Sequence, residues 1–258
     1  MEEKIVLINS LKTNFKVAGQ GPAILILHGW GGSSFSWLKV QKLLTAKSYK
    51  VICPDFPGFG KSKTPKEPWS ITDYVRWTVD FMKSQKLDRF FLLGHSFGGR
   101  VAIKFAVEFP EKVKALILCD TAGIKREPNL KTKIVFLLSK VGNMIFAPKF
   151  LVRFKDKARN LFYIFLRHKD YVKANGIMKE TMKKVLDEDL LSYLSNIKIK
   201  TLIVWGRKDK IVPLEDAYFF KEKINNSQLE ILPEIGHSPH LEVPEKLVNI
   251  ISNFLSPV

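Results

Sequence analysis

The sequence has few cysteines and no long apolar run. Only two of its 258 residues are cysteine, Cys53 and Cys119, and each lies near the end of a β-type run without a metal-ligand spacing. In a chain with no disulfide framework we expect both to be buried free thiols in a reducing compartment. The start lacks the basic and apolar pattern of a secretion signal, and no run approaches the roughly 18 apolar residues of a membrane span. We therefore expect a cytoplasmic protein.

Acidic residues are scarce relative to basic ones. The chain holds 42 Lys and Arg against 25 Asp and Glu, which gives a formal net charge of +17. Residues 123–190 alone contain 16 of the basic residues and only 7 acidic ones. Such an excess can mark a surface for nucleic acid or anionic membrane, but no nucleic-acid-binding motif and no long apolar face accompany it. We interpret the lysines as solvated helix faces and expect neither nucleic acid nor a membrane as a partner.

The chain does contain a regular alternation of β-type and helical segments. Continuous apolar runs are typical of buried parallel strands, and amphipathic helical patterns lie between them. Strands are expected at 5–8, 15–18, 23–27, 51–53, 90–93, 113–119, 201–205 and 229–232, with the first two forming a hairpin. Helices are expected at 36–46, 71–85, 97–109, 214–224 and 244–255. This order predicts an α/β fold, with a mostly parallel eight-stranded sheet flanked by helices.

The alternation stops between Thr121 and about Ile197. This stretch is rich in aromatic residues and has helical patterns at 134–141, 148–167 and 170–185. We interpret it as a helical cap inserted into one domain. The expected organisation is a first core part at residues 1–122, a cap or lid at 123–196 and a second core part at 197–258.

The most informative residues are Gly94-His95-Ser96-Phe97-Gly98, a G-x-S-x-G sequence between an apolar run and a helical one. The order strand, sharp turn, helix is the context of a nucleophile elbow. Glycines two residues on either side of the serine leave room for the strand and the helix to pass closely. By itself the pentapeptide also fits an ordinary glycine-rich turn, because short motifs match often.

A second glycine-rich sequence, His28-Gly29-Trp30-Gly31-Gly32, directly follows the apolar run at 23–27. Glycines here let backbone N–H groups turn toward a ligand, and in acyl transfer such donors bind the developing oxyanion. By position, we expect the N–H groups of Trp30 and Phe97 to be the two donors. An ordinary turn at a strand end fits this motif equally well. The residues expected to contact the substrate are His28, Gly29, Trp30, Phe35 and Phe97.

Two aspartates are candidates for a catalytic acid. Asp209 follows the run at 201–205, at a strand end where a carboxylate can orient a histidine. By itself it also fits a turn residue that caps the next helix. Asp120 follows the run at 113–119, but Thr121-Ala122-Gly123 lead from it directly into the expected cap. We therefore choose Asp209, whose loop is free to reach a histidine.

His237, in Gly236-His237-Ser238-Pro239-His240, follows the last β-type run. This position suits a general base that titrates near neutral pH. Two histidines three residues apart could suggest a metal, but no further His or Cys lies nearby, so no metal site is expected. We expect His240 to pack at the start of the last helix and His95 to pack beneath the serine.

Taken together, these motifs resemble those of the α/β-hydrolase superfamily, in the cap-bearing branch close to small esterases and carbon–carbon bond hydrolases. The resemblance implies a nucleophile at Ser96, a base at His237 and an acid at Asp209. Relatives that open epoxides or remove halogen use an aspartate nucleophile, so the serine argues against both activities. The matching segments span nearly the whole chain outside the cap: His28–Gly32, Asp55–Ser62, Gly94–Gly99, Gly206–Pro213 and Gly236–Pro244.

The expected function is hydrolysis of carboxylic esters of small to medium, largely apolar substrates through an acyl-enzyme on Ser96, with no cofactor or metal. The same residues could instead cleave a carbon–carbon bond, a lactone, an amide or a thioester. A ligand receptor that retains the three residues without turnover is a further alternative. The expected partner is a small-molecule ester, and the chain is expected to be a monomer or a homodimer.

Overall fold

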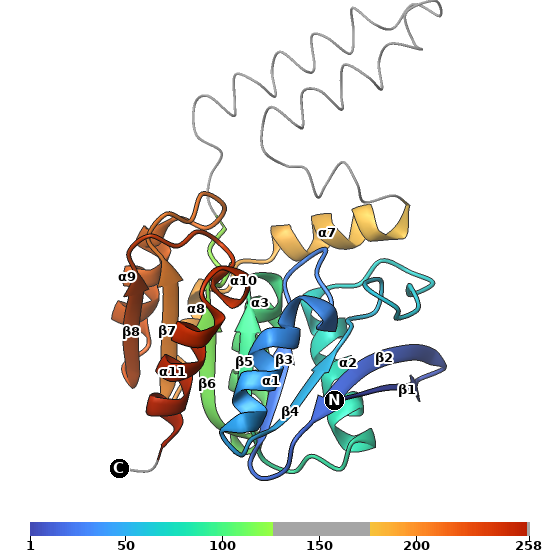
Figure 1. The fold of residues 1–258 in the computed structure, drawn as a ribbon. Helices are drawn as coiled ribbons and strands as arrows, with labels where there is room; N and C mark the ends of the chain where they lie inside the picture. Colours follow the sequence, from blue (N-terminus) through green and yellow to red (C-terminus); the bar gives the residue numbers. More distant parts are fainter. Residues whose placement is uncertain (126–175, 257–258) are drawn as a thin grey trace, which may run out of the picture.

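The computed structural model describes residues 1–125 and 176–256. In this part of the chain, eight strands form one sheet in the order β1-β2-β4-β3-β5-β6-β7-β8 (Figure 1). Strand β2 is antiparallel to both of its neighbours, and all other pairs are parallel. The α/β class and the mostly parallel eight-stranded sheet are thus confirmed. The strands are β1 (Glu2–Ile8), β2 (Leu11–Ala18), β3 (Ala23–Leu27), β4 (Lys50–Pro54), β5 (Phe90–His95), β6 (Val113–Cys119), β7 (Thr201–Gly206) and β8 (Ser227–Leu232).

Helices cover both faces of the sheet, as its continuous apolar strands require. Alternate residues of β3 belong to different apolar clusters: Leu25 and Leu27 face one way, Ile24 and Ile26 the other. The first face packs against α2 (Ile71–Ser84), α3 (Phe97–Glu108) and α9 (Leu214–Lys223). The second packs against α1 (Leu38–Ala46) and α11 (Pro244–Leu255), which lie in front of the sheet in Figure 1.

The helix starts follow local sequence signals. Ser70 and Asp73 form a reciprocal capping box at the start of α2, where Asp73 Oδ2 accepts the Ser70 N–H at 2.8 Å. The expected helix at 36–46 is two elements, a 3-10 turn η1 (Ser34–Trp37) followed by α1. The break falls at Trp37, whose φ of −100° and ψ of 3° depart from helical values.

The carboxyl ends of the parallel strands gather at one edge of the sheet. The pairs Leu27↔Gly94, His95↔Cys119 and Gly206↔Leu232 place these strand ends at neighbouring positions. The loops that carry the sequence-predicted site residues all leave from this edge. Ligands bind at such an edge in open α/β sheets, so the topology itself brings these loops together.

The end of the expected cap is helical where the structure describes it. Helix α7 (Ile177–Asp187) lies across this edge of the sheet (Figure 1), and the short α8 (Leu191–Leu194) follows it. Thr181 of α7 is buried, and its hydroxyl accepts the Trp69 N–H at 3.0 Å. The helices expected at 134–141 and 148–167, and the start of the one at 170–185, lie outside the described residues. The cap and its boundaries at 123 and 196 therefore stay a prediction.

Two composition-based expectations can be compared with the described residues. Cys53 and Cys119 are buried free thiols, and burial raises the pKa of both well above the usual value. No helix within residues 1–125 and 176–256 is long and apolar enough to cross a membrane.

Candidate active site

Ser96 occupies a strained turn between β5 and α3. Its φ of +52° and ψ of −115° lie in a backbone region where residues other than glycine are rarely found. The Ser96 N–H donates to the Cys119 carbonyl at 3.1 Å, which ties the turn to strand β6. A Cβ on Gly98 would lie 2.1 Å from the Leu27 carbonyl oxygen, and one on Gly94 would lie 2.6 Å from the Gly98 oxygen. Glycine is required at both positions because the helix crosses the strands at contact distance.

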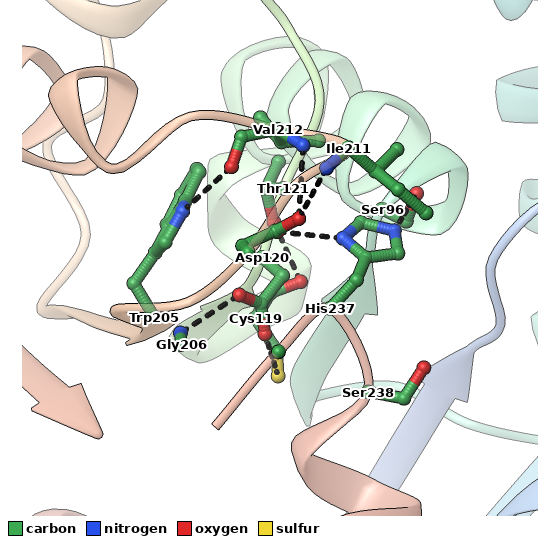
Figure 2. A network of polar contacts seen from close by, with 12 residues as sticks. Ser96, Cys119, Asp120, Thr121, Trp205, Gly206, Ile211, Val212, His237 and Ser238 are labelled. Carbon is green, nitrogen blue, oxygen red and sulfur yellow. Dashed lines mark hydrogen bonds and ion pairs between the residues drawn. The ribbon is translucent and has the colours of Figure 1, made fainter. Parts of the chain in front are cut away.

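The structure brings Ser96, His237 and Asp209 into one chain of hydrogen bonds (Figure 2). His237 Nδ1 lies 2.7 Å from Asp209 Oδ2, and His237 Nε2 lies 3.0 Å from Ser96 Oγ. A carboxylate only accepts, so Nδ1 carries the proton and the lone pair of Nε2 faces the serine hydroxyl. This is the tautomer that a general base for Ser96 needs.

Asp209 is held by its own loop. Its side chain is fully buried, and Oδ1 accepts the N–H groups of Ile211 at 2.7 Å and Val212 at 3.0 Å. Helix α9 begins after Pro213 without a side-chain cap, so Asp209 organises the loop rather than the helix. The other candidate acid, Asp120, lies behind this loop and accepts the Gly206 N–H at 2.8 Å. Of the two aspartates, the structure pairs Asp209 with His237.

The two residues expected to supply the oxyanion donors, Trp30 and Phe97, line the same cavity as Ser96. Phe97 is the first residue of α3, where backbone N–H groups have no partner within the helix. Trp30 follows the end of β3, and its ring packs against that of Phe97 at 5.3 Å between centroids. Both residues line the cavity with Gly29, Ser96 and His237. A carbonyl oxygen bound beside Ser96 would thus lie near the positive end of α3.

The cavity at this site has a volume of about 500 Å³. Its wall includes apolar side chains from three places in the chain: Met182, Val185 and Leu186 of α7, Ile211 after β7, and Leu241. The structure does not place His28 and Phe35 among the lining residues. Phe35 is 71% exposed, and His28 is fully buried with its Nε2 accepting the Phe56 N–H at 3.0 Å. Of the five expected substrate contacts, Gly29, Trp30 and Phe97 line the cavity.

Arg100 is a buried cation on the cavity wall that the sequence analysis did not single out. It is 3% exposed and donates from Nη2 to the Glu188 carbonyl oxygen, while its Nε has no partner among the described residues. Burial lowers the pKa of Arg100 to about 10, although the negative charges of Glu188 and Asp189 act to raise it. Lys104, one helical turn further along α3, pairs with the Glu188 carboxylate at 2.5 Å. These contacts tie α3 to the segment between α7 and α8.

Two further histidines, His95 and His240, lie near His237, and both are buried. His95 donates from Nε2 to the His237 carbonyl at 2.8 Å, which fixes the backbone of His237 from beneath the elbow. Burial, with smaller contributions from His240 and His237, holds the pKa of His95 well below its usual value. Burial also lowers the pKa of His240 to about 3, and its ring stacks on Trp37 at 4.3 Å. Both rings are therefore neutral near pH 7.

Glu242 holds the loop of His237 from the solvent side. It ends the short helix α10 (Pro239–Glu242), and its carboxylate accepts the Gly236 N–H at 3.0 Å and the Ser238 N–H at 3.3 Å. These two amides flank His237 on either side. The sequence analysis included Glu242 only within a matching segment, because an exposed glutamate by itself signals nothing.

Asp55, the first residue of the matching segment Asp55–Ser62, has a structural role. Its buried carboxylate accepts the Ser34 N–H at 2.7 Å, the Lys61 N–H at 2.8 Å and the Asn14 amide at 3.0 Å. It thereby joins the loops after β3 and β4 to strand β2. The glycine-rich loop that carries Trp30 is held from behind by this network.

The carboxylates of Asp120 and Asp209 and the His237 ring offer potential metal ligands within 4.8 Å of one another. The oxygens of Asp209 already accept three N–H bonds, one of them from His237. A metal ion bound here would have to displace the contact between Asp209 and His237. The expectation of a site without metal or cofactor stays a prediction.

Comparisons with known proteins give matches over nearly the whole chain. The family model described as "alpha/beta hydrolase fold" matches residues 22–169 and 136–244. The 2-hydroxy-6-oxo-6-(2'-aminophenyl)hexa-2,4-dienoic acid hydrolase of Metapseudomonas resinovorans is 30% identical over 98% of this chain and 91% of its own. The mouse monoacylglycerol lipase ABHD6 is 29% identical over 93% of this chain and 77% of its own. An esterase structure from Exiguobacterium antarcticum matches with a TM-score of 0.77 at 24% identity, covering 99% of this chain and 100% of that one.

The two bonds that Glu242 accepts lead to a prediction about His237. Glu242→Ala removes both anchors of the loop and should lower kcat on a p-nitrophenyl ester by at least about tenfold, since the loss of even one hydrogen bond to a charged group is of this size. Glu242→Gln keeps an acceptor oxygen and should lose less. Glu245→Ala is the matched control, because this exposed glutamate pairs with Lys39 instead. Equal rates for the two alanine variants would contradict the prediction.

Proposed function

The chain belongs to the α/β-hydrolase family, and from this premise we propose that it is a serine hydrolase that cleaves carboxylic esters. The observation that carries the proposal is the unbroken hydrogen-bond chain from Ser96 through His237 to Asp209 on the wall of a cavity. Ser96 is the nucleophile, His237 the general base and Asp209 the acid that orients it. The N–H groups of Trp30 and Phe97 bind the oxyanion.

In the acylation step, His237 Nε2 takes the proton of the Ser96 hydroxyl, 3.0 Å away, as Oγ attacks the ester carbonyl. The imidazolium that forms is stabilised by Asp209, whose fully buried side chain keeps its charge close to the ring. The carbonyl oxygen becomes negative and is bound by backbone N–H groups that need no reorganisation. His237 then gives its proton to the departing alcohol, and the acyl group remains on Ser96.

Deacylation repeats the same proton movements with water in place of the serine hydroxyl. His237 Nε2 removes a proton from the water as it attacks the acyl-enzyme, and then returns that proton to Ser96. The neutral His95 and His240 rings add no positive charge that would oppose the imidazolium. The mechanism requires no metal and no cofactor.

The cavity supports small to medium, largely apolar substrates. Its volume of about 500 Å³ is within the ordinary range of small-molecule sites, about 300–1,000 Å³. The side chains that α7 contributes, Met182, Val185 and Leu186, are apolar. We further propose that the protein acts in the cytoplasm as a monomer or homodimer, with no nucleic acid or membrane as partner.

A second candidate function is cleavage of a carbon–carbon bond in an acidic substrate by the same three residues. Two observations favour it. Relatives that match over 98% of this chain act on 2-hydroxy-6-oxo-dienoic acids, according to their names. The buried cation Arg100 lines the cavity, its Nε has no partner within residues 1–125 and 176–256, and a substrate carboxylate could interact with it. Lactone, amide and thioester hydrolysis, or ligand binding without turnover, are supported by no particular contact.

Removal of the nucleophile tests the proposal directly. Ser96→Ala should lower kcat by about a million-fold, the loss typical of a serine nucleophile in a triad. A fluorophosphonate probe should label the wild type and not this variant. Ser238→Ala is the control, because Ser238 lines the same cavity but its hydroxyl lies away from the His237 ring and outside the hydrogen-bond chain (Figure 2). Retained ester hydrolysis or retained labelling in Ser96→Ala would exclude the proposed function.

The assignment of Asp209 rather than Asp120 as the acid can be tested with two variants. Asp209→Asn removes the charge that stabilises the imidazolium and should lower kcat by about a thousand-fold or more. Asp120→Asn should cost far less, because Asp120 is paired with Gly206 rather than with His237. Both variants are measured on one ester, with folding checked by circular dichroism. If Asp120→Asn is the crippled variant, the acid is Asp120.

A substrate panel separates the two candidate functions. Acyl p-nitrophenyl esters of increasing chain length should show a preference for short to medium chains, because the cavity is apolar and limited in volume. A vinylogous diketone acid tests carbon–carbon cleavage on the same enzyme. A strong preference for the anionic substrate, lost in Arg100→Met, would favour the second candidate and would make basic side chains part of the pocket.

A further inference from the structure

Asp120 is a second carboxyl group beside the hydrogen-bond chain, and the mechanism above gives it no task. It follows the last residue of β6 with a φ of +41°, and its side chain is fully buried. The Asp120 N–H donates to the Val204 carbonyl at 3.0 Å, and Oδ1 accepts the Gly206 N–H at 2.8 Å. Its backbone is therefore held in a strained conformation that directs the carboxyl group to the Gly206 N–H at the end of β7 (Figure 2).

The carboxyl groups of Asp120 and Asp209 lie so close together that ionising one disfavours ionising the other. One oxygen each from Asp120 and Asp209 lies within 4.8 Å of the other and of the His237 ring. Two like charges at this separation in a buried place cannot both be ionised at low cost. One of the two groups therefore keeps a proton at neutral pH, and the donors around each group decide which.

The donors favour charge on Asp209. Its oxygens accept three N–H bonds, from Ile211, Val212 and His237. Those of Asp120 accept one N–H bond, from Gly206, and a weak contact of 3.6 Å from the Cys119 thiol. A carboxylate with more donors is stabilised more strongly in its charged form. Asp120 is therefore the group that holds the proton.

The other titratable groups near Asp120 do not change this assignment. Cys119 precedes it on the chain, and burial keeps that thiol protonated. The basic side chains of the loop above it, Arg207, Lys208 and Lys210, are exposed to solvent. Burial raises the pKa of Asp120 to about 8. The charge of Asp209 and a hydrogen bond with Asp209 also raise this pKa, whereas the hydrogen bond from the Gly206 N–H lowers it.

We propose that Asp120 is a positioning residue that acts as a neutral carboxylic acid and donates a hydrogen bond to Asp209. Asp209 then carries the only negative charge of the pair and keeps its remaining acceptor capacity directed at His237. The proposal rests on the proposed function of Ser96, His237 and Asp209, and assigns to Asp120 no contact with substrate.

A direct test is infrared difference spectroscopy of the wild type against Asp120→Asn. At pH 7 the wild type should show the C=O stretch of a protonated carboxyl group that the variant lacks, and the band should fade as pH rises through about 8. Absence of this band at pH 7 overturns the proposal. The measurement needs no substrate, so its result does not depend on the proposed function.

Thermal unfolding provides a second readout, with a defined sign. The folded chain keeps the Asp120 proton up to about pH 8, whereas the unfolded chain loses it near 3.8, the ordinary pKa of an aspartate. Between these values the unfolded state binds fewer protons, so Asp120 costs the wild type stability as pH rises. The Tm of Asp120→Asn minus that of the wild type should therefore grow from pH 4 to 8. Asp88→Asn is the control, since Lys112 lowers the pKa of that exposed carboxyl and no such growth is expected.

Activity separates positioning from mere packing. Asn can accept from Gly206 and donate to Asp209, so Asp120→Asn should keep kcat within about threefold of wild type at pH 7, whereas Asp120→Ala should lose about tenfold or more. The kcat/KM profile of the wild type should bend near pH 8, and that of Asp120→Asn should not. Equal kcat for the two variants, or the same bend in both the wild type and Asp120→Asn, overturns the proposal. Fluorophosphonate labelling of Ser96 in every variant shows separately whether the proposed function holds.

Discussion

Helix α3 approaches strand β3 so closely that glycine is required at their contact, and the arrangement of the site depends on this approach. The Cβ that Gly98 lacks would lie 2.1 Å from the Leu27 oxygen. With the helix this near, the chain leaves β5 through a single strained residue, Ser96, at a φ of +52°. The same contact places the first N–H group of α3 next to the serine and the turn after β3 opposite it. The proposed nucleophile and oxyanion donors are therefore positioned by one packing constraint.

Charge in the site is limited by burial. Several titratable groups lie close together at this edge of the sheet, among them His28, His95, His240, Asp120 and Asp209. Burial lowers the pKa of the three histidines and raises that of Asp120. Among these groups in the described part of the chain, Asp209 accepts three N–H bonds, one of them from His237. This is the arrangement that the proposed mechanism requires of the acid that orients His237.

The elements of the core could be predicted because their signals are local. The apolar run at 23–27 and its glycine-rich end, or the run at 90–93 and Gly94–Gly98, have the same meaning wherever the strands pair. The start of the helix expected at 71–85 agrees with that of α2, where Ser70 and Asp73 form the capping box. Element ends were less accurate, as at residues 36–46, where a 3-10 turn precedes the helix. No periodic signal distinguishes such a turn from the first turn of an α-helix.

The sequence by itself determined the fold class. It also indicated that the loops of Ser96, Asp209 and His237 lie close together, because strand-end motifs in a parallel sheet converge on one edge. Which side chains touch was decided only by tertiary structure. The contact between Asp209 and His237, the burial of His28 away from the cavity and the placement of Arg100 on its wall depend on how separate loops pack. The two bonds of Glu242 and the nearness of Asp120 to Asp209 join segments that no sequence pattern connects. Hydrogen bonds and charge competition act through distances across the fold, which residue spacing along the chain does not contain.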